Sequence, residues 1–408
     1  MPTAEHRRLA EPSTSLVPPW RRWGCYVSER AWGTVREDYS PHGDAWNHLP
    51  HDKARSKAYR WGEDGIAGLC DRYQLLIFSV GLWNGRDPIL KERLFGLTSG
   101  EGNRGEDVKE YYFYLDATPT GSYMKLLYKY PQAEYPYGRL LDENRRRGGG
   151  GMEFELLDSG VFEGDRYFDV VVEYAKADPE DICIRIEAFN RGPEDAPIHV
   201  LPHLWFRNTW GWGSTRGPQP AITRGTSGQG VQSLVADDAA VNPLPNLMFD
   251  YRLGMRHLYG PDGGAPLFTD NETNAEAVYG PGNRSASEFT KDAFHRRVVR
   301  GEASTNPAEV GTKACVHYQG VVPARSSLVW HLRLTPNAMK EPLADADGVV
   351  TERRSEADEF FAAVHPPKAS ADERLVQRQA LAGMLWTCLL YTSPSPRDRT
   401  RPRMPSSA

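Results

Sequence analysis

The chain has 408 residues, of which 39% are hydrophobic and 25% charged, so it can bury a large core and has room for two domains. Its formal net charge of −5 shows no basic excess, which argues against nucleic acid or an anionic membrane as a partner. The five cysteines form no CxxC pair, so neither a disulfide framework nor a zinc site is predicted. With no signal-type leader and no membrane-length apolar run, we expect a cytoplasmic protein.

The first 350 residues have the pattern of a mainly β protein. Residues 1–19 are predicted to be a flexible lead-in. From residue 20 onward, short apolar or alternating runs are broken by turn residues, including many of the 38 Gly and 31 Pro of the chain. This pattern is typical of a large antiparallel sandwich, which we expect over residues 20–350. The clearest predicted strands are residues 111–115, with apolar side chains on both faces, 167–174, 182–189 and 327–334.

The first candidate site is an acidic loop within residues 92–116, which an aromatic strand follows at once. Three glycines bend the loop, where carboxylates can accept hydrogen bonds from sugar hydroxyls while neighbouring rings stack on pyranose faces. Packing between domains and a solvated loop are the alternatives, with Lys109 and Arg104 as counter-charges for the acids. The residues predicted to contact a sugar are Glu101, Asn103, Glu106, Asp107 and Glu110.

The second candidate site is the aromatic stretch of residues 205–212, which contains three tryptophans. Such a stretch can form a stacking platform for sugars, and an arginine within it can bind a carboxylate through two parallel hydrogen bonds. The alternative is core packing at an edge of the sandwich. The residues predicted to contact a sugar here are Arg207, Asn208 and Trp210.

No metal or cofactor site is predicted. Two histidines and two aspartates lie close together in the sequence without a third placed ligand: His48, His51, Asp44 and Asp52. Residues 270–272 lack the spacing of a calcium-binding EF-hand loop and are predicted to be a turn. The three arginines at 145–147, followed by four glycines, resemble an RNA-binding patch only superficially and are predicted to be a flexible solvated loop.

The character of the sequence changes near residue 351. Residues 352–364 are rich in helix formers, and two prolines soon after them end the predicted helix. Ser370 and Glu373 have the spacing of a capping box, which predicts a second helix over residues 372–386. We therefore expect residues 351–387 to be a helical region that follows the sandwich.

Residues 388–408 fit nothing that precedes them, because they break the helical pattern and are rich in Ser, Pro and Arg. Read back into codons, residues 388–398 and 403–408 match, in order, two parts of a sequencing-library adapter. We interpret this tail as an artefact and exclude it from the fold. It carries four arginines and one aspartate, so the rest of the chain has a formal charge of −8. The natural protein is expected to continue past Trp386.

From about residue 30 to Trp386, the chain resembles the N-terminal part of bacterial glucosidases related to glycoside hydrolase family 63, which have a catalytic region like that of mannosylglycerate hydrolase. The resemblance implies a β-supersandwich, a helical linker and a C-terminal (α/α) toroid, of which residues 372–386 form the first helix. The blocks that carry it are WGTVREDYS at 32–40, YRWGEDGIAGLCDRYQLL at 59–76, LWNGRDPILKERLFGL at 82–97, GNRGEDVKEYYFYLDATPT at 102–120, RYFDVVVEYAKA at 166–177, LPHLWFRNTW at 201–210 and ADERLVQRQALAGMLW at 371–386.

The resemblance also implies inverting, α-glucosidase-like hydrolysis of glucosides or oligosaccharides by two carboxyl groups on the toroid. No position of this chain matches those two groups, so no catalytic residue is assigned to it. We therefore expect a non-catalytic N-terminal portion of such an enzyme, inactive by itself. The alternative is a free-standing carbohydrate-binding β-sandwich without catalysis.

Overall fold

Strands are the main regular structure in the computed structural model, which describes residues 2–12, 17–26, 50–59, 65–105, 107–211, 216–226, 228, 230–241 and 251–387. The strands are β1 (Trp23–Tyr26), β2 (Ile66–Asp71), β3 (Leu76–Trp83), β4 (Gly96–Leu97), β5 (Asp107–Val108), β6 (Tyr112–Ala117), β7 (Tyr123–Pro131), β8 (Tyr167–Asp178), β9 (Asp181–Asn190), β10 (Ala196–Phe206), β11 (Ala221–Arg224), β12 (Val231–Asp237), β13 (Arg256–Pro261), β14 (Ala265–Thr269), β15 (Val310–Gly311), β16 (Lys313–Val322) and β17 (Ser327–Thr335).

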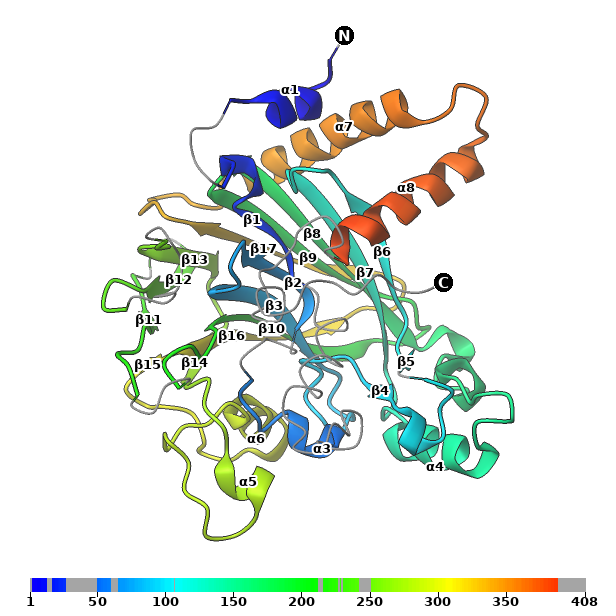
Figure 1. Cartoon of the computed structure of the whole chain (residues 1–408), viewed down its shortest axis with the longest axis vertical. Coiled ribbons are helices and arrows are strands. Elements are labelled where there is room, and N and C mark those ends of the chain that lie inside the picture. The colour runs from blue at the N-terminus through cyan, green and yellow to red at the C-terminus, as the bar shows by residue number, and fades with distance from the viewer. Residues whose placement is uncertain are drawn as a thin grey trace, which may run out of the picture.

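These strands form two large antiparallel sheets and a small one (Figure 1). The six-stranded sheet has the order β1-β2-β3-β10-β16-β14, and the nine-stranded sheet has the order β15-β11-β12-β13-β17-β9-β8-β7-β6. The small sheet pairs β4 with β5. The strands predicted at 167–174, 182–189 and 327–334 are confirmed as β8, β9 and β17, and so is the mainly β sandwich class.

The main core lies between the two large sheets because alternate side chains of each strand point inward. Phe78 and Val200 enter it from the six-stranded sheet, and Val172, Ile184 and Leu332 enter it from the nine-stranded sheet. All five side chains are fully buried. The register of β9 against β17 sets Ile184 opposite Leu332, which keeps both on the inner face.

Helices cover the outer faces and one end of the sandwich (Figure 1). None of those in the described ranges has the length and apolarity needed to cross a bilayer. They are α1 (Ala4–Ala10), α3 (His51–Ala54), α4 (Tyr137–Arg147), α5 (Ala275–Tyr279), α6 (Ala293–Arg300), α7 (Ala346–Val364) and α8 (Ala371–Trp386), with short 3₁₀ turns at Pro19–Arg21, Ser99–Glu101, Leu156–Ser159 and Glu163–Asp165.

The α7 helix covers the outer face of the nine-stranded sheet. Its Val350 and Ala357 share a buried cluster with Ala175 of β8 and Cys183 of β9. Cys183 is thus a small buried core residue. The helix begins at Ala346, six residues earlier than predicted, and its other side is reached by α1.

The α8 helix confirms the predicted capping box, since the Ser370 side chain accepts from the Glu373 backbone N–H. It lies against β6, and its last turn enters the main core. There the Trp386 ring stacks on Tyr114 with centroids 5.3 Å apart, and its Nε1 donates to the Asp116 carbonyl at 3.0 Å. The C-terminal end of α8 is therefore anchored between the sheets.

Three predictions about local structure are wrong. Residues 4–10 are helical rather than a flexible lead-in, because Thr3 caps α1 and Arg8 pairs with Glu356 of α7. Residues 145–147 form the last turn of α4 rather than a loop. Phe113 of the aromatic strand β6 lies opposite Leu127 on the outer face of the nine-stranded sheet, where it is 40% exposed instead of being covered on both faces. The docking of α1 and the covering of β6 depend on distant parts of the chain, and local sequence does not contain that information.

Some predictions fall on residues outside the described ranges. They include the block at 32–40, the pair Asp44 and His48, and the tail at 388–408. The structure says nothing about these segments.

Candidate functional site

The acidic loop connects β4 to β5 and lies against α4. Gly102 has φ +93°, and a Cβ there would come within 2.4 Å of the Asn144 backbone oxygen, so the loop needs glycine at this position. Glu101 closes a local capping box by accepting from the Thr98 backbone N–H at 2.9 Å. Asn103 is buried and donates to the Gly105 carbonyl at 3.1 Å. These two predicted sugar contacts therefore hold the shape of their own loop.

Glu110 is buried at the centre of a polar network in the core. Its Oε1 accepts from Lys91 Nζ at 2.8 Å and from the Phe95 backbone N–H at 2.9 Å. Its Oε2 accepts from the Tyr128 hydroxyl at 2.6 Å. The Lys91 ammonium also lies 3.8 Å from the centroid of the Tyr135 ring. Burial raises the pKa of Tyr128 well above its ordinary value, so this hydroxyl remains a donor.

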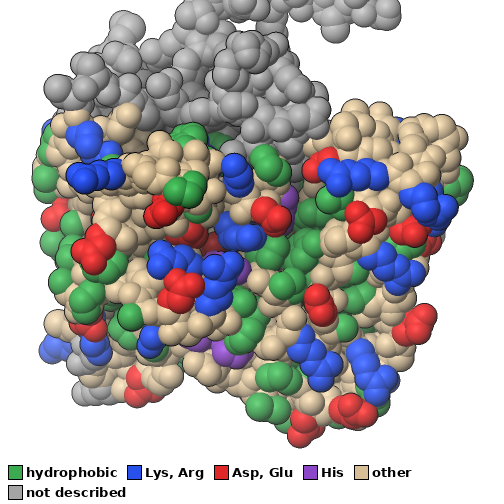
Figure 2. Space-filling model, turned by 90° about the horizontal axis from the view of Figure 1, so that it is seen from below, with side chains coloured by type: hydrophobic (Ala, Val, Ile, Leu, Met, Phe, Trp, Pro, Cys, Tyr) green, Lys and Arg blue, Asp and Glu red, His purple; other side chains and the backbone are tan. Residues whose placement is uncertain are grey.

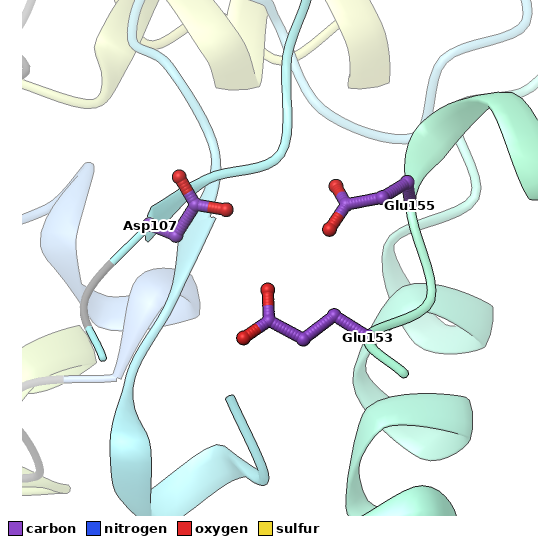
Figure 3. A group of neighbouring side chains, drawn as sticks. All are labelled: Asp107, Glu153 and Glu155. Atoms are coloured by element: carbon purple, nitrogen blue, oxygen red, sulfur yellow. The ribbon is translucent and has the colours of Figure 1, made fainter. Parts of the chain in front are cut away.

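Asp107 belongs to a group of three carboxylates with Glu153 and Glu155, which Figure 3 shows pointing toward one another. Lys109 Nζ donates to all three, at 3.0, 2.9 and 2.8 Å. Burial lowers the pKa of Lys109, but the bonds to Glu155, Glu153 and Asp107 outweigh it and raise the pKa overall. The lysine ammonium therefore takes the place that a metal ion would need. Glu106 lies outside the described residues.

Arg207 follows the end of β10 and is buried beside Asp71. Its backbone N–H donates to the Leu75 carbonyl at 2.9 Å. Burial lowers the pKa of Arg207 to about 10, while the nearby Asp71 charge opposes the shift, so the guanidinium is charged at neutral pH. The side chain is placed to balance a buried aspartate, and it has little exposed surface with which to meet a ligand.

Trp210 is buried and belongs to the main core, which favours the alternative of core packing at the sandwich edge. Its indole Nε1 donates to Glu272 Oε1 at 2.6 Å, and Arg216 pairs with the same carboxylate. Asn208 donates to the Asn271 carbonyl at 2.8 Å. Hydrogen bonds therefore join the 205–210 stretch to the predicted turn at 270–272. Trp212 lies outside the described residues.

A second polar cluster, which the sequence analysis missed, lies on the outer face of the six-stranded sheet. Glu92 Oε2 accepts from Lys313 Nζ at 3.0 Å, and His203 Nδ1 is 3.9 Å from the same oxygen. All three side chains are buried. The signal in the sequence was partial, because His203 interrupts the apolar run LPHLWF. A buried charge in such a run requires a partner.

This cluster contains the three residue types of a hydrolase triad, because Ser79 stands opposite His203 in the register of β3 and β10. Its geometry does not fit that chemistry. Within the described residues, Ser79 Oγ and His203 Nε2 form no hydrogen bond, and no member of the cluster is open to solvent. Burial, and then the Lys313 charge, lowers the pKa of His203 well below its ordinary value. The cluster therefore ties residues 82–97 to β10 and β16.

His199 and His317 form a cross-strand pair farther along the same outer face. His199 Nδ1 and His317 Nε2 are 2.7 Å apart, and the two rings stack with centroids 4.9 Å apart. Burial lowers the pKa of His199. It lowers the pKa of His317 to about 4, with the charges of His199 and Arg297 adding to the effect. A hydrogen bond between two ring nitrogens requires that at least one ring be neutral, so that its nitrogen can accept, and the lowered pKa values favour this state.

No protein-family model matches the chain. The uncharacterized protein YMR196W of Saccharomyces cerevisiae is 38% identical over 431 residues, an alignment that covers 95% of this chain and 38% of that protein. The chain therefore spans well under half the length of this curated relative.

The solved structures that align with the chain include the following two. A human-microbiome protein assigned as a kojibiose phosphorylase aligns with a TM-score of 0.25 and 9% identity, over 90% of this chain and 38% of that one. A family GH92 inverting mannosidase from Bacteroides thetaiotaomicron aligns with a TM-score of 0.23 and 8% identity, over 77% of this chain and 35% of that one. Similarity at this level establishes neither a common fold nor a common activity.

Proposed function

We propose that the chain is the non-catalytic N-terminal part of an α-glucosidase-like glycoside hydrolase, whose two catalytic carboxyl groups lie on a helical toroid beyond Trp386. The observation that carries the proposal is the order of the elements. A large antiparallel sandwich comes first, and α7 and α8 follow it, which is the order that the sequence resemblance implies. Seven sequence blocks in consistent order support the same family.

The partners of the loop acids support a non-catalytic role for this part. Glycoside hydrolysis by inversion needs two carboxyl groups on opposite sides of the scissile bond, about 6.5–9.5 Å apart. Glu110 is bonded to Lys91, Asp107 to Lys109, and Glu101 to its own loop. Carboxylates held in this way brace a rigid sandwich, against which a catalytic domain can be positioned.

Exposed apolar side chains of α8 support a continuation into further helices. Leu375, Val376 and Met384 are exposed on this helix, at 53%, 60% and 45%. Exposed apolar side chains concentrated on one helix favour a covering partner. In the proposed enzyme, the next helices of the toroid cover them.

We also propose that the enzyme works in a reducing compartment such as the cytoplasm. Cys183 and Cys315 are buried thiols outside any disulfide. Burial raises the pKa of both thiols, Cys183 to about 12, which keeps them protonated and unreactive.

The test compares this chain with an extended chain made from the source gene read beyond the codon for Trp386. We expect no release of glucose from maltose or p-nitrophenyl α-glucoside by residues 1–387, and turnover by the extended chain. Turnover by residues 1–387 alone contradicts the non-catalytic role. An extended chain that is folded but inactive on α-glucosides, β-glucosides and α-mannosides contradicts the glycosidase assignment. A reading frame that runs uninterrupted through residues 388–408 in genomic DNA contradicts the artefact interpretation of the tail.

A further inference from the structure

Two buried N–H donors without a protein acceptor lie at the lower end of the molecule in Figure 1, one just after α3 and one in α6. They are Arg55 Nη1 and His295 Nε2, and neither has a hydrogen-bond partner within the described residues. Figure 2 views this end from below and shows Lys and Arg side chains gathered near its middle beside histidine atoms. A buried donor without an acceptor is costly, so such a pair indicates a ligand that can accept.

The His295 ring presents a fixed donor. The Leu90 backbone N–H donates to its Nδ1 at 3.2 Å, so in the neutral ring the hydrogen is on Nε2. Burial, and then the charges of Arg55 and Arg300, lowers the pKa of His295 to about 4, so the ring is neutral at pH 7. The side chain is 2% exposed. It therefore offers one buried N–H in the neighbourhood of two guanidinium groups.

A hydrogen bond between neighbouring residues places Arg55 beside His295. Ser56, the next residue after Arg55, donates from Oγ to Asp292 Oδ2 at 2.7 Å. Asp292 lies three residues before His295 at the start of α6, so the two share one side of the helix. Asp292 also accepts from an amide and from a hydroxyl of neighbouring segments. Its oxygens are thus already bonded, and it does not serve as the acceptor for Arg55.

The positive charge at this place exceeds the negative charge bonded to it. Asp52 Oδ1 is 3.8 Å from Arg55 Nη2, beyond hydrogen-bonding distance, and the Asp52 side chain is 82% exposed. Burial lowers the pKa of Arg55, and the like charge of Arg300 adds to the effect while Asp52 opposes it. Glu302 is 3.8 Å from Arg300 and bonds at 2.6 Å to Arg296 instead. A buried guanidinium in this position requires a further anion.

The open pocket beside α5 is a different place. It has a volume of about 550 Å³, and its lining includes Glu276, Glu288, Arg284 and Arg296. Charges of both signs are mixed there, and Arg296 is bonded to Glu302. That pocket therefore has no surplus of positive charge, and none of Arg55, His295 and Arg300 lines it.

We infer that Arg55, His295 and Arg300 form a binding site for a phosphate group. Arg55 and His295 would donate to its inner oxygens, and Arg300 would face it from the solvent side. The side chains of Arg55 and Arg300 are 15% and 57% exposed, which leaves an approach from solvent. A phosphate has enough acceptor oxygens and charge for two guanidinium groups and one N–H, whereas a carboxylate brings a single charge. The inference goes beyond the proposed function, because it needs no catalytic carboxyl group.

Titration calorimetry of the full chain in phosphate-free buffer, at neutral pH and constant ionic strength, tests the inference. Inorganic phosphate or glucose 6-phosphate is expected to bind with a Kd on the order of 1 mM or tighter. Binding of both supports a site for the free ion, and binding of glucose 6-phosphate alone supports a site for a sugar phosphate. Acetate and glucose are expected to bind at least about tenfold more weakly. The inference is overturned if neither phosphate binds at about 10 mM, or if acetate binds as well as the better of them.

Variants locate the site. Arg55→Met and Arg300→Gln are each expected to weaken phosphate binding at least about tenfold. The matched control is Arg325→Gln, because the Arg325 side chain is 56% exposed and pairs with Asp165 at 3.2 Å, outside the site. It is expected to bind within about twofold of the parent. Unchanged affinity in both site variants, or equal loss in the control, overturns the assignment.

Thermal melting separates a ligand site from a structural charge. Arg55→Met removes a buried charge that lacks a bonded partner, so in phosphate-free buffer its Tm is expected to be no lower than that of the parent. Phosphate should raise the Tm of the parent and leave that of the variant unchanged. A variant that melts clearly lower without phosphate, or fails to fold, shows that the protein already satisfies Arg55 and overturns the inference. Failure to bind phosphate leaves the glycosidase proposal untouched, because the glucose-release assay is independent of this site.

Discussion

The acidic loop before β6 and the pocket beside α5 both carry acidic side chains, yet the partners of these acids differ. In the loop, Glu110 is bonded to Lys91 and Asp107 to Lys109. In the pocket, Glu276 and Glu288 have no protein partner among the described residues. The difference is that other parts of the chain supply lysine partners to the loop acids and none to the pocket acids among the described residues. Whether an acid is available to a ligand depends on the lysines and backbone N–H groups that folding brings to it.

The largest expected effect is at the buried pair of Glu110 and Lys91. Glu110→Ala leaves the Lys91 ammonium buried without its carboxylate, and we expect a loss of about 3–5 kcal/mol in the free energy of unfolding. Urea denaturation measures this loss. The double variant Glu110→Leu with Lys91→Met removes both charges and is expected to recover part of it. A single variant that loses less than about 1 kcal/mol would mean that the loop acids are as free as those of the pocket.

The next effect is at Lys109. Lys109→Met leaves Asp107, Glu153 and Glu155 facing one another, and we expect a loss on the order of 2 kcal/mol at pH 7. The bond from Lys109 lowers the pKa of Glu153, so its stabilising contribution is present above pH 4.5 and disappears as the pH falls through the lowered pKa. Denaturation at pH 7 and at pH 3 checks the sign, because the variant should approach the parent at the lower pH. An equal loss at both values would show that the lysine acts by packing alone.

As the pH falls, we expect the six-stranded sheet to lose stability at a higher pH than the acidic loop does. Burial lowers the pKa of His317 to about 4, and burial followed by the charges of Arg55 and Arg300 lowers that of His295 to about 4. Between about pH 6.5 and 4 the unfolded chain binds protons that the folded chain does not, so stability falls as the pH decreases. Each histidine is expected to contribute on the order of 1–3 kcal/mol to this decline. Urea titrations of His317→Gln and His295→Asn should give flatter profiles over that window, and parent-like profiles would refute the assignment.

The smallest expected effect is at the pocket acids. Glu276→Gln and Glu288→Gln remove exposed charges that have no protein partner, so each is expected to change the free energy of unfolding by less than about 0.5 kcal/mol. Thermal melting beside Glu110→Ala gives the contrast directly. A loss above about 1 kcal/mol would mean that these acids are also structural.

The local parts of the fold were predictable because they depend on neighbours in sequence. The alternation around Ile184 predicts β9, and the spacing of Ser370 and Glu373 predicts the start of α8. The helix over residues 4–10 was missed, because α1 is short and is held by Glu356, which lies far along the chain. The exposure of Phe113 was equally hard to predict, since it depends on what covers the outer face of the nine-stranded sheet at β6.

The candidate sites show the same limit. The sequence identified Glu110 and Trp210 as notable, but not that Lys91 and Glu272 would hold them. The Glu92–Lys313 pair joins residues 221 positions apart, so no local pattern links its two halves. The pocket acids were overlooked because exposed charges on a one-turn helix and the loop after it have no periodicity. Whether these carboxylates have protein partners can be seen only in the three-dimensional structure.

The ion pair between Arg8 and Glu356 bears on how the protein is made. Its two residues are 348 positions apart, and α1 docks on α7 through them. At a translation rate of about 5–20 residues per second, Glu356 is synthesised roughly 20–70 s after Arg8. Throughout that interval the emerging N-terminal helix has no α7 to dock on, while the strands between them can already pair. The α1 helix can bond its Glu5 to Thr120 and Ser122 early, but its contact with α7 forms only after the rest of the sandwich has been synthesised.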